Sequence, residues 1–560
     1  MFNELKEKYK LLKNHTLNDL AGINVNGILL SKNSNNTFEV VYCNSVRKPQ
    51  TSNLRSLWKT RRQGTAVPLI VACEYENKFS VCGPVGDEPP VYENIEKNIA
   101  LTICSEALDM ESYPLALRSV KDNLVTIEDK TIGLKNEGLF ANHVLSESYK
   151  NNQDWEKYKE KSLKVVGKKD KELLKALGYE LTPLDSLTHI LKAEGKKKAL
   201  GVLLRPNEMV DLQSARFGGL TPISHAFNLA DRENLPFVIV SSASSIRLYS
   251  TEIGLGVGRK GRTETFVHCQ TNLLGEKEIG NLWLIFAAEA LNKKGTFYQL
   301  IDDSTRFSGS LADKLRERIY IEVVPLLANG IFEELFKGKI KRDSLNKIYE
   351  MSMLILFRIL FIAYAEDKDL LPYKSNDLYK KRSLKNIALE LKGLIDKKEI
   401  SKLGNSKVYW DSLKHIFSAI NFGNKQWSVP AYNGGLFLDD NSLLYADELS
   451  KLSIKDKYIG KALSILLLTE QEDTLGPVDF RSLGVREFGS IYEGLLEGTL
   501  NYADENLEVL PNGVVKLAKE KSKTNLINKG TLYLSNKSGE RKATGTYFTK
   551  SFVVDYLLQN

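Results

Sequence analysis

A run of apolar residues past the middle of the chain places the strongest constraint on its fold. Nearly every residue from Met351 to Ala363 is apolar, with Ser352 and Arg358 as the exceptions. A helix that is apolar on most sides must be buried on most sides, so we expect the core helix of a helical domain. An unpaired buried charge is costly, and Arg358 therefore needs a partner, for which Glu366 or Asp367 is the expected choice.

Helical patterning extends to both sides of this run. Residues 311–336 have apolar positions three and four apart and stop before Gly338, as a helix does, and Asp343 begins the next helix. The sequence therefore predicts a mainly α-helical connector domain over residues 280–475.

The amino-terminal half has a different pattern. Short β-branched and aromatic runs at 38–42, 67–72 and 78–82 alternate with turn residues, which predicts a mixed α/β domain over residues 1–150. A lysine-rich helical stretch at 150–178 leads into a second α/β domain, which we place at residues 151–279. There we expect a strand at 198–205, a helix at 222–233, and strands at 235–241, 245–249 and 265–270.

Composition narrows the class of protein. The chain has 560 residues, a formal net charge of +8 and 26% charged residues, which is ordinary for a globular protein and permissive for DNA binding. Five cysteines without a CxxC pair predict neither a zinc site nor a disulfide framework. No metal site is predicted from these residues. The charged amino terminus has no apolar signal core, and the apolar run is short and contains Arg358, so we expect a cytoplasmic protein with no membrane role.

A basic helix in the first domain is a candidate DNA contact. Arg55, Lys59 and Arg62 lie within one to two helical turns of each other, and Arg61 is adjacent. Such a face can meet phosphates, and we take Arg61 and Arg62 as candidate DNA-binding residues. The alternative is that these side chains form an ordinary solvent-exposed face of the helix and bind no ligand.

The last stretch of the sequence combines a glycine turn with a helix start. Arg541 and Lys542 lead to Gly545, then to Tyr547, Phe548 and Thr549, and an apolar run at helical spacing follows. Thr549 or Ser551 is the expected N-cap. A helix start of this kind offers unpaired backbone N–H groups to an anionic group of a ligand.

This stretch resembles the motif that opens the catalytic domain of adenine-specific DNA methyltransferases of the gamma class. Three further segments, in the same order as in type IIG restriction–modification enzymes and related phage-defence methylases, are similar to that group. They are the Phe357-Arg-Ile-Leu-Phe361 run with Tyr364-Ala-Glu-Asp367, the Tyr432-Asn-Gly-Gly-Leu-Phe437 turn, and the Gly489-Ser-Ile-Tyr-Glu493 run. The family's proline after the threonine is Lys550 here.

The resemblance implies specific roles for the last stretch. Gly545, Tyr547, Phe548 and Thr549 would form part of the pocket for S-adenosylmethionine, and Arg541 and Lys542 would contact DNA phosphate or pair locally. Residues 476–560 would then open a Rossmann-like methyltransferase domain. Such chemistry also needs a glycine turn after a strand and an Asn/Asp-Pro-Pro-aromatic loop, and neither lies in this chain. We therefore expect the catalytic half not to be contained in it.

The resemblance also implies a restriction-endonuclease-like domain at the front, to which the strand–helix–strand–strand order and the Arg247-Leu-Tyr249 element are similar. An active nuclease needs two carboxylates and a lysine to hold Mg²⁺. The expected strand, 199–204, holds no carboxylate, and the nearest candidates are Asp185, Glu194 and Lys196. We expect a degenerate domain that positions DNA, with Mg²⁺ as a cofactor only if those three residues converge.

Three functions remain open from the sequence. The first is the front portion of an adenine-specific DNA methyltransferase that acts on double-stranded DNA in restriction–modification or phage defence. The second is a non-catalytic subunit that binds DNA or docks a defence-system partner protein. The third is a Mg²⁺-dependent DNA nuclease.

Overall fold

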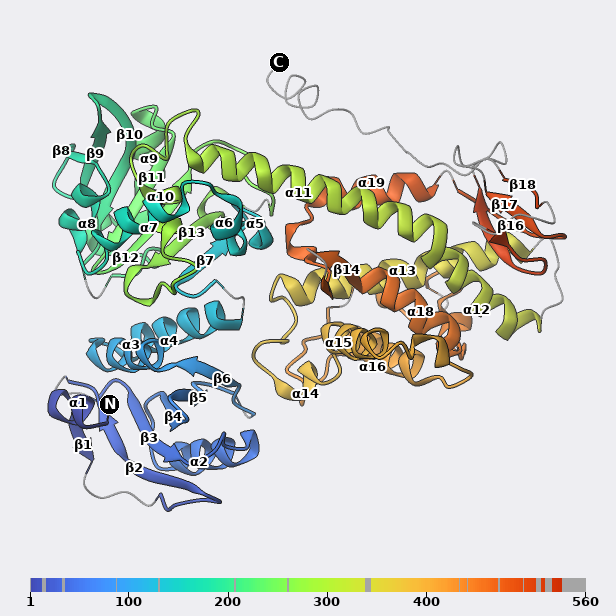
Figure 1. Ribbon diagram of the computed structural model, residues 1–560, viewed down its shortest axis with the longest axis horizontal. Helices are drawn as coiled ribbons and strands as arrows, with labels where there is room; N and C mark the ends of the chain where they lie inside the picture. The colour runs from blue at the N-terminus through green and yellow to red at the C-terminus, as the bar shows by residue number, and fades with distance from the viewer. Residues whose placement is uncertain are drawn as a thin grey trace. The chain divides into compact units, whose positions relative to one another are not determined.

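The computed structural model forms two compact units, which are drawn in Figure 1. The first comprises residues 1–307 with 374–376, and the second comprises residues 308–373 with 377–560. The structure describes residues 2–12, 17–32, 36–86, 88–128, 131–205, 208–258, 261–337, 344–432, 434–440, 442–471, 474–496, 498–509, 515–518 and 526–535.

A six-stranded sheet forms the first part of the first unit. Its strands lie in chain order, and only β3 and β4 are parallel, joined by the crossover helix α2. The elements are α1 (Phe2–Lys8), β1 (Lys10–Leu12), β2 (Ile23–Leu30), β3 (Glu39–Ser45), α2 (Thr51–Gln63), β4 (Leu69–Tyr75), β5 (Lys78–Cys82), β6 (Val91–Glu96), α3 (Lys97–Asp109) and α4 (Tyr113–Glu128). The strands predicted at 38–42, 67–72 and 78–82 and the basic helix are confirmed.

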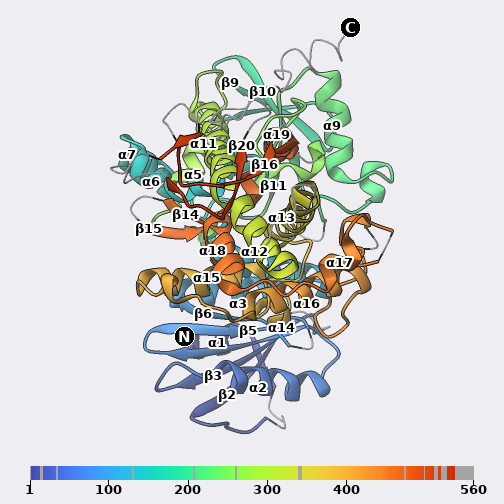
Figure 2. The ribbon, with the colours of Figure 1, turned by 90° about the vertical axis from the view of Figure 1, so that its right-hand side faces the viewer.

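Helices cover both faces of this sheet, as Figures 1 and 2 show. Leu54, Leu57 and Trp58 of α2 pack on one face against β-strand residues such as Val41 and Val71. The apolar sides of α3 and α4 cover the other face. Alternate residues of each strand point to opposite faces, so a sheet with two apolar faces needs cover on both.

A seven-stranded sheet forms the rest of the first unit. Its order is β7-β13-β12-β11-β10-β9-β8, and only β10 and β11 are parallel, joined by α9. The elements are β7 (Leu134–Glu137), α5 (Asn142–Ser146), α6 (Ser148–Asn151), α7 (Trp155–Leu163), α8 (Asp170–Ala176), β8 (Glu180–Pro183), β9 (Thr188–Ala193), β10 (Lys196–Leu203), α9 (Pro222–Arg232), β11 (Phe237–Ser242), β12 (Ser245–Ser250), β13 (Phe266–Gln270) and α10 (Gly280–Phe286).

Local sequence explains the crossover helix of this sheet. Thr221 caps α9, because its side-chain oxygen accepts the N–H of Ser224, and Pro222 occupies the first turn. Ile223, Ala226 and Phe227 then face β10 and β11, so α9 buries one face of the parallel pair. The predicted helix and its flanking strands are confirmed.

The second unit is mainly helical. Its elements are α12 (Val324–Phe336), α13 (Leu345–Asp367), α14 (Asp377–Lys380), α15 (Leu384–Asp396), α16 (Val408–Phe422), α17 (Ala446–Ser450), α18 (Asp456–Leu467), β14 (Leu468–Gln471), β15 (Thr474–Pro477), α19 (Val485–Leu496), β16 (Thr499–Tyr502), β17 (Leu507–Val509), β18 (Val515–Leu517), β19 (Leu526–Ile527) and β20 (Leu532–Ser535). Figure 2 shows α12 between α13 and α18. The fold is thus an α/β amino-terminal region followed by a largely helical part.

The apolar run forms α13, the central helix of this unit. By length and composition it is the one helix in the described part of the chain that could cross a membrane, because the helix extends beyond the apolar run to 23 residues. However, 67% of its most apolar window is buried inside the structure, as in the core helix of a soluble protein.

The helix predicted at 311–336 is longer and less regular than its pattern indicates. The helix α11 (Thr296–Arg318) begins earlier, and one π-helical turn (Ile319–Val323) joins it to α12. Pro325 lies in the first turn of α12 and has no N–H to donate to the preceding turn. The wider π turn accommodates that missing hydrogen bond without ending the helix.

Glu333 provides a test of how α12 is held against the start of α18. Its carboxylate accepts hydrogen bonds from Lys455, Lys457 and Tyr458 at 2.6–2.7 Å, which lowers its pKa to about 2. We expect Glu333→Gln to lower the free energy of unfolding by about 1–2 kcal/mol at neutral pH, since the carboxylate is partly exposed. Because the folded-state pKa is depressed, this stabilisation is present above the unfolded pKa near 4.5 and is lost as pH falls toward 2.

Urea unfolding between neutral and acidic pH measures this effect. The matched control is Glu334→Gln on the next residue of the same helix. Equal losses for the two variants at neutral pH would contradict the assignment.

Candidate functional site

Three segments that the sequence analysis singled out, residues 357–367, 432–437 and 489–493, meet at α13. The first contact is made by Arg358, whose guanidinium is buried. Its Nε donates to the carbonyl of Leu436 at 2.8 Å and its Nη2 to the carbonyl of Leu438 at 2.6 Å. The same group lies over the rings of Phe417 and Phe437. Burial lowers the pKa of Arg358 to about 10, so the group remains a cation at neutral pH.

The expected pairing of Arg358 with Glu366 or Asp367 is wrong. Eight or nine residues along a helix separate the Cα atoms by about 12–14 Å, and because all side chains of a helix lean toward its amino terminus, the lean does not close this distance. The backbone carbonyls of Leu436, in the Tyr432–Phe437 turn, and of Leu438, just after it, take the place of the two carboxylates. Tyr432 adds a hydrogen bond from its hydroxyl to the carbonyl of Leu370, and its ring packs on Phe361.

Glu366 holds the start of α15. Its carboxylate accepts hydrogen bonds from the Tyr379 hydroxyl at 2.8 Å and from the backbone N–H groups of Leu384 and Lys385 at 2.9 and 3.0 Å. The first N–H groups of a helix have no partner within it, and an anion there is favourable. Burial raises the pKa of Glu366 to about 7, although these three donors oppose the shift. The N-cap Ser383 is the only sequence signal for this contact.

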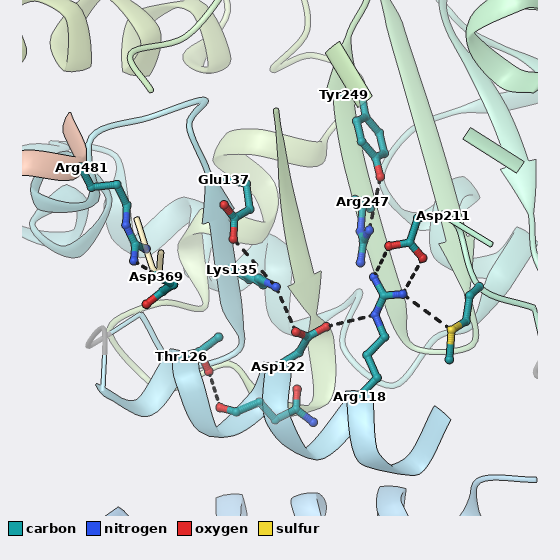
Figure 3. Close-up of polar contacts among 12 residues, drawn as sticks. Arg118, Asp122, Thr126, Lys135, Glu137, Asp211, Arg247, Tyr249, Asp369 and Arg481 are labelled. Atoms are coloured by element: carbon teal, nitrogen blue, oxygen red, sulfur yellow. Dashed lines mark hydrogen bonds and ion pairs between the residues drawn. The ribbon is translucent and has the colours of Figure 1, made fainter. Parts of the chain in front are cut away.

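Asp367 anchors the segment that precedes α19. Its carboxylate accepts the N–H of Phe480 at 2.7 Å and pairs with the ammonium of Lys385 at 2.6 Å. Arg481 donates to the backbone carbonyl of Asp367 at 2.7 Å and pairs with Asp369 at 3.1 Å, as Figure 3 shows for the second contact. Burial raises the pKa of Asp367, and Lys385 opposes that shift.

Aromatic contacts extend this anchoring along α19. Phe488 packs edge-on against Tyr364, with ring centroids 5.3 Å apart, and Tyr492 packs on Phe357 at 5.5 Å. Ile491 is fully buried. The Gly489–Glu493 run is therefore held along α13, and we name the contacts of α13 with the 432–438 turn, α15 and the 478–496 segment the connector hub.

The candidate nuclease residues do not come together. Asp185 precedes β9, where its Oδ1 accepts the N–H groups of Leu187 and Thr188, and these hydrogen bonds lower its pKa against the effect of burial. Glu194 and Lys196 lie at the β9–β10 turn, at the opposite end of β9. A six-residue strand spans about 20 Å, so the three side chains cannot share one Mg²⁺. Within the described ranges, no group of three or more His, Cys, Asp or Glu residues could hold a metal ion.

The strand that would have to supply the second carboxylate supplies none. Thr188 pairs with Val202 of β10, and the residues of β10 (Lys196–Leu203) include no carboxylate.

The two candidate DNA-binding arginines of α2 differ in their surroundings. Arg61 forms a two-pronged ion pair with the buried carboxylate of Glu39, at 2.7 and 2.9 Å, which joins α2 to the start of β3. It is thus held in a structural pair. No local pattern reveals this partner, because Glu39 lies in a strand distant in sequence.

Arg62 donates to the carbonyl of Val67 at 2.8 Å and lines a groove of about 680 Å³. Lys59 lines the same groove and pairs with Glu88. The groove is also bounded by Trp58, Gln63, Ala66, Pro68, Pro84, Val85, Gly86, Tyr113 and Leu117. Of the two predicted arginines, Arg62 is the one positioned to meet a ligand.

The predicted cofactor pocket lies elsewhere in the chain. Arg541, Lys542, Gly545, Tyr547, Phe548 and Thr549 are outside the described residues, so their roles stay predictions.

Comparison with protein-family models, with curated proteins and with solved structures finds no match for this chain.

Asp367 provides the test of the connector hub. We expect Asp367→Asn to lower the free energy of unfolding by about 3 kcal/mol, because it leaves the ammonium of Lys385 largely buried without its charge partner. In the Lys385→Met background the same change should cost less, since no unpaired charge remains. Denaturant unfolding of the wild type, the two single variants and the double variant measures this coupling.

The control is Asp369→Asn, which removes the exposed ion pair with Arg481 and should cost less than about 1 kcal/mol. A loss for Asp367→Asn no larger than that of the control would contradict the hub.

Proposed function

We propose that this chain is the front portion of an adenine-specific DNA methyltransferase of restriction–modification or phage-defence type. The complete protein would transfer a methyl group from S-adenosylmethionine to the exocyclic amine of adenine in double-stranded DNA. The observation that carries the proposal is the connector hub. Segments that resemble the family's connector, and that are separated by many residues, make their contacts with one another.

The particular side chains of those motifs support this interpretation. Arg358 of the first motif contacts the backbone of the second, and Asp367 and Tyr364 contact the segment that contains the third. Chance similarity in composition gives no reason for motif residues to be each other's partners. Such contacts are expected if the motifs share a structural role, which is to hold the part of the chain that leads into a catalytic domain.

In this proposal the connector fixes the path from α19 through β16–β20 toward the segment from Arg541 onward. Gly545, Tyr547, Phe548 and Thr549 would hold the methionine end of S-adenosylmethionine, which supplies the methyl group. Arg541 and Lys542 would contact the DNA backbone. Because the reactive base must leave the duplex, the targeting domains have to hold the DNA while it is rotated out.

The second sheet of the first unit fits a restriction-endonuclease-like domain that positions DNA without cutting it. Its β10-α9-β11-β12 order supports this assignment. The separation of Asp185 from Glu194 and the apolar β10 disfavour the Mg²⁺-dependent nuclease. A cytoplasmic location follows from the proposed substrate. The alternative that remains is a non-catalytic subunit that binds DNA or docks a partner protein.

The test uses the complete open reading frame that contains this chain, expressed in a host that lacks adenine methylation. We expect N6-methyladenine at a defined sequence in the host DNA, detected by single-molecule sequencing. Phe548→Ala should lower the affinity for S-adenosylmethionine about tenfold or more, because an aromatic contact worth on the order of 1 kcal/mol or more is removed with its buried area. Phe422→Ala, at an exposed position of α16, is the matched control.

An absence of methyladenine together with retained DNA binding would contradict the methyltransferase and favour the non-catalytic subunit. Cleavage of DNA in Mg²⁺ that is abolished by Asp185→Asn would favour the nuclease instead.

A further inference from the structure

Basic side chains form a row across the second sheet. Lys135 of β7, His268 of β13 and Arg247 of β12 are successive cross-strand neighbours, so they lie on one face of the sheet. Arg118 of α4 approaches the same row, and Figure 3 shows its guanidinium close to that of Arg247.

Two carboxylates, those of Asp122 and Asp211, form ion pairs with Lys135 and Arg118. Asp122 pairs with Lys135 at 2.9 Å and more weakly with Arg118 at 3.7 Å. The carboxylate of Asp211 accepts a hydrogen bond from each terminal nitrogen of Arg118, and the distance from Nη2 to Oδ2 is 2.6 Å. Burial opposes the charge of Asp211, but Arg118 and then Arg247 hold its pKa below the usual range. Asp211 therefore makes its hydrogen bonds to Arg118 and acts on Arg247 through its charge.

Arg247 is the group with too few partners. The residue is only 9% exposed, and its one side-chain hydrogen bond within the described chain is from Nη1 to the Tyr249 hydroxyl at 3.3 Å. Its guanidinium stacks on Phe266, 4.3 Å from the ring centroid. A guanidinium has five N–H donors, and the Arg247 nitrogens that make no hydrogen bond within the described chain are not fully enclosed. The site can therefore accept further oxygen atoms.

His268 does not add to the positive charge. Burial, and then the neighbouring Arg247, lower its pKa to about 3, so the ring is neutral at physiological pH. The excess donors of the site belong to the arginines.

We propose that Arg118 and Arg247 form a site for a phosphodiester group of DNA, and that Asp211 occupies the place of that phosphate in the free protein. A carboxylate and a phosphate both accept paired hydrogen bonds from a guanidinium, and the tetrahedral arrangement of the phosphate oxygens suits acceptance from two guanidinium groups on different sides. The Asp211 side chain is 50% exposed, so it can leave toward solvent and admit the anion. The proposal rests on double-stranded DNA being the partner in the proposed function.

The chain offers a matched control for this exchange. Arg262 makes the same two-pronged pair with Asp231, at 2.9 and 3.0 Å, and also lies over an aromatic ring, that of Phe227. The two ion pairs have similar exposure and lie in the same part of the first unit. Asp231→Asn therefore removes the same charge as Asp211→Asn without freeing a second arginine.

The experiment measures the affinity of the chain for a fluorescent DNA duplex of about 20 base pairs, by anisotropy, at salt concentrations from about 50 to 300 mM. We expect Asp211→Asn to tighten binding several-fold more than Asp231→Asn does. Arg247→Gln should weaken binding about tenfold relative to Arg262→Gln and should reduce the salt slope by about one, and Arg247→Lys should recover part of the loss. Thermal unfolding of each variant checks that the fold is retained.

The outcomes separate this inference from the proposed function. Suppose that the wild-type chain binds the duplex, but the Asp211 and Asp231 variants bind it with equal affinity, or the Arg247 and Arg262 variants do. The phosphate site is then wrong, and DNA remains the partner. If the wild-type chain does not bind the duplex at any of these salt concentrations, both the phosphate site and the proposed DNA partner are wrong. An Asp211→Asn variant that is destabilised can still test the site. If the site is correct, DNA should raise the melting temperature of this variant more than that of the wild type.

Discussion

The buried charges of α13 are the constraint on which the second unit depends. One guanidinium and two carboxylates of this helix are buried, and an unpaired charge there would cost several kcal/mol by order of magnitude. Each obtains its partners from a segment distant in sequence: the 436–438 carbonyls for Arg358, the start of α15 for Glu366, and the N–H of Phe480 for Asp367. A packing that moved any of these segments would leave a charge unpaired. We infer that these charges select one arrangement of the helices around α13.

The sequence predicts the elements better than it predicts their contacts. Periodicity and caps locate α2, α9 and the strands around α9, because each signal lies within the element itself. The partner of Arg358 was not predictable in this way, since backbone carbonyls have no residue identity to read. The π turn before Pro325 was not predicted either, because the apolar pattern indicates an uninterrupted helix. The pairing of Arg61 with Glu39 was not predicted because it depends on how α2 packs against β3.

The first unit shows why chemistry-bearing residues must be judged in three dimensions. Asp185, Glu194 and Lys196 have the residue types of a metal site, but the direction of β9 separates them. Arg118, Asp211 and Arg247 have no recognisable spacing, yet α4, the 208–214 loop and β12 bring them together. Both findings fit a domain that holds the DNA backbone rather than one that cuts it. Such a domain would complement a connector that orients a catalytic domain.

Binding of S-adenosylmethionine to the complete protein tests the central claim most directly. Equilibrium dialysis with labelled cofactor should give saturable binding at about one molecule per chain, competed by S-adenosylhomocysteine and weakened when the connector hub is disrupted at Asp367. No saturable binding by a folded complete protein would contradict the account, because a connector of this kind would then lead to no cofactor pocket.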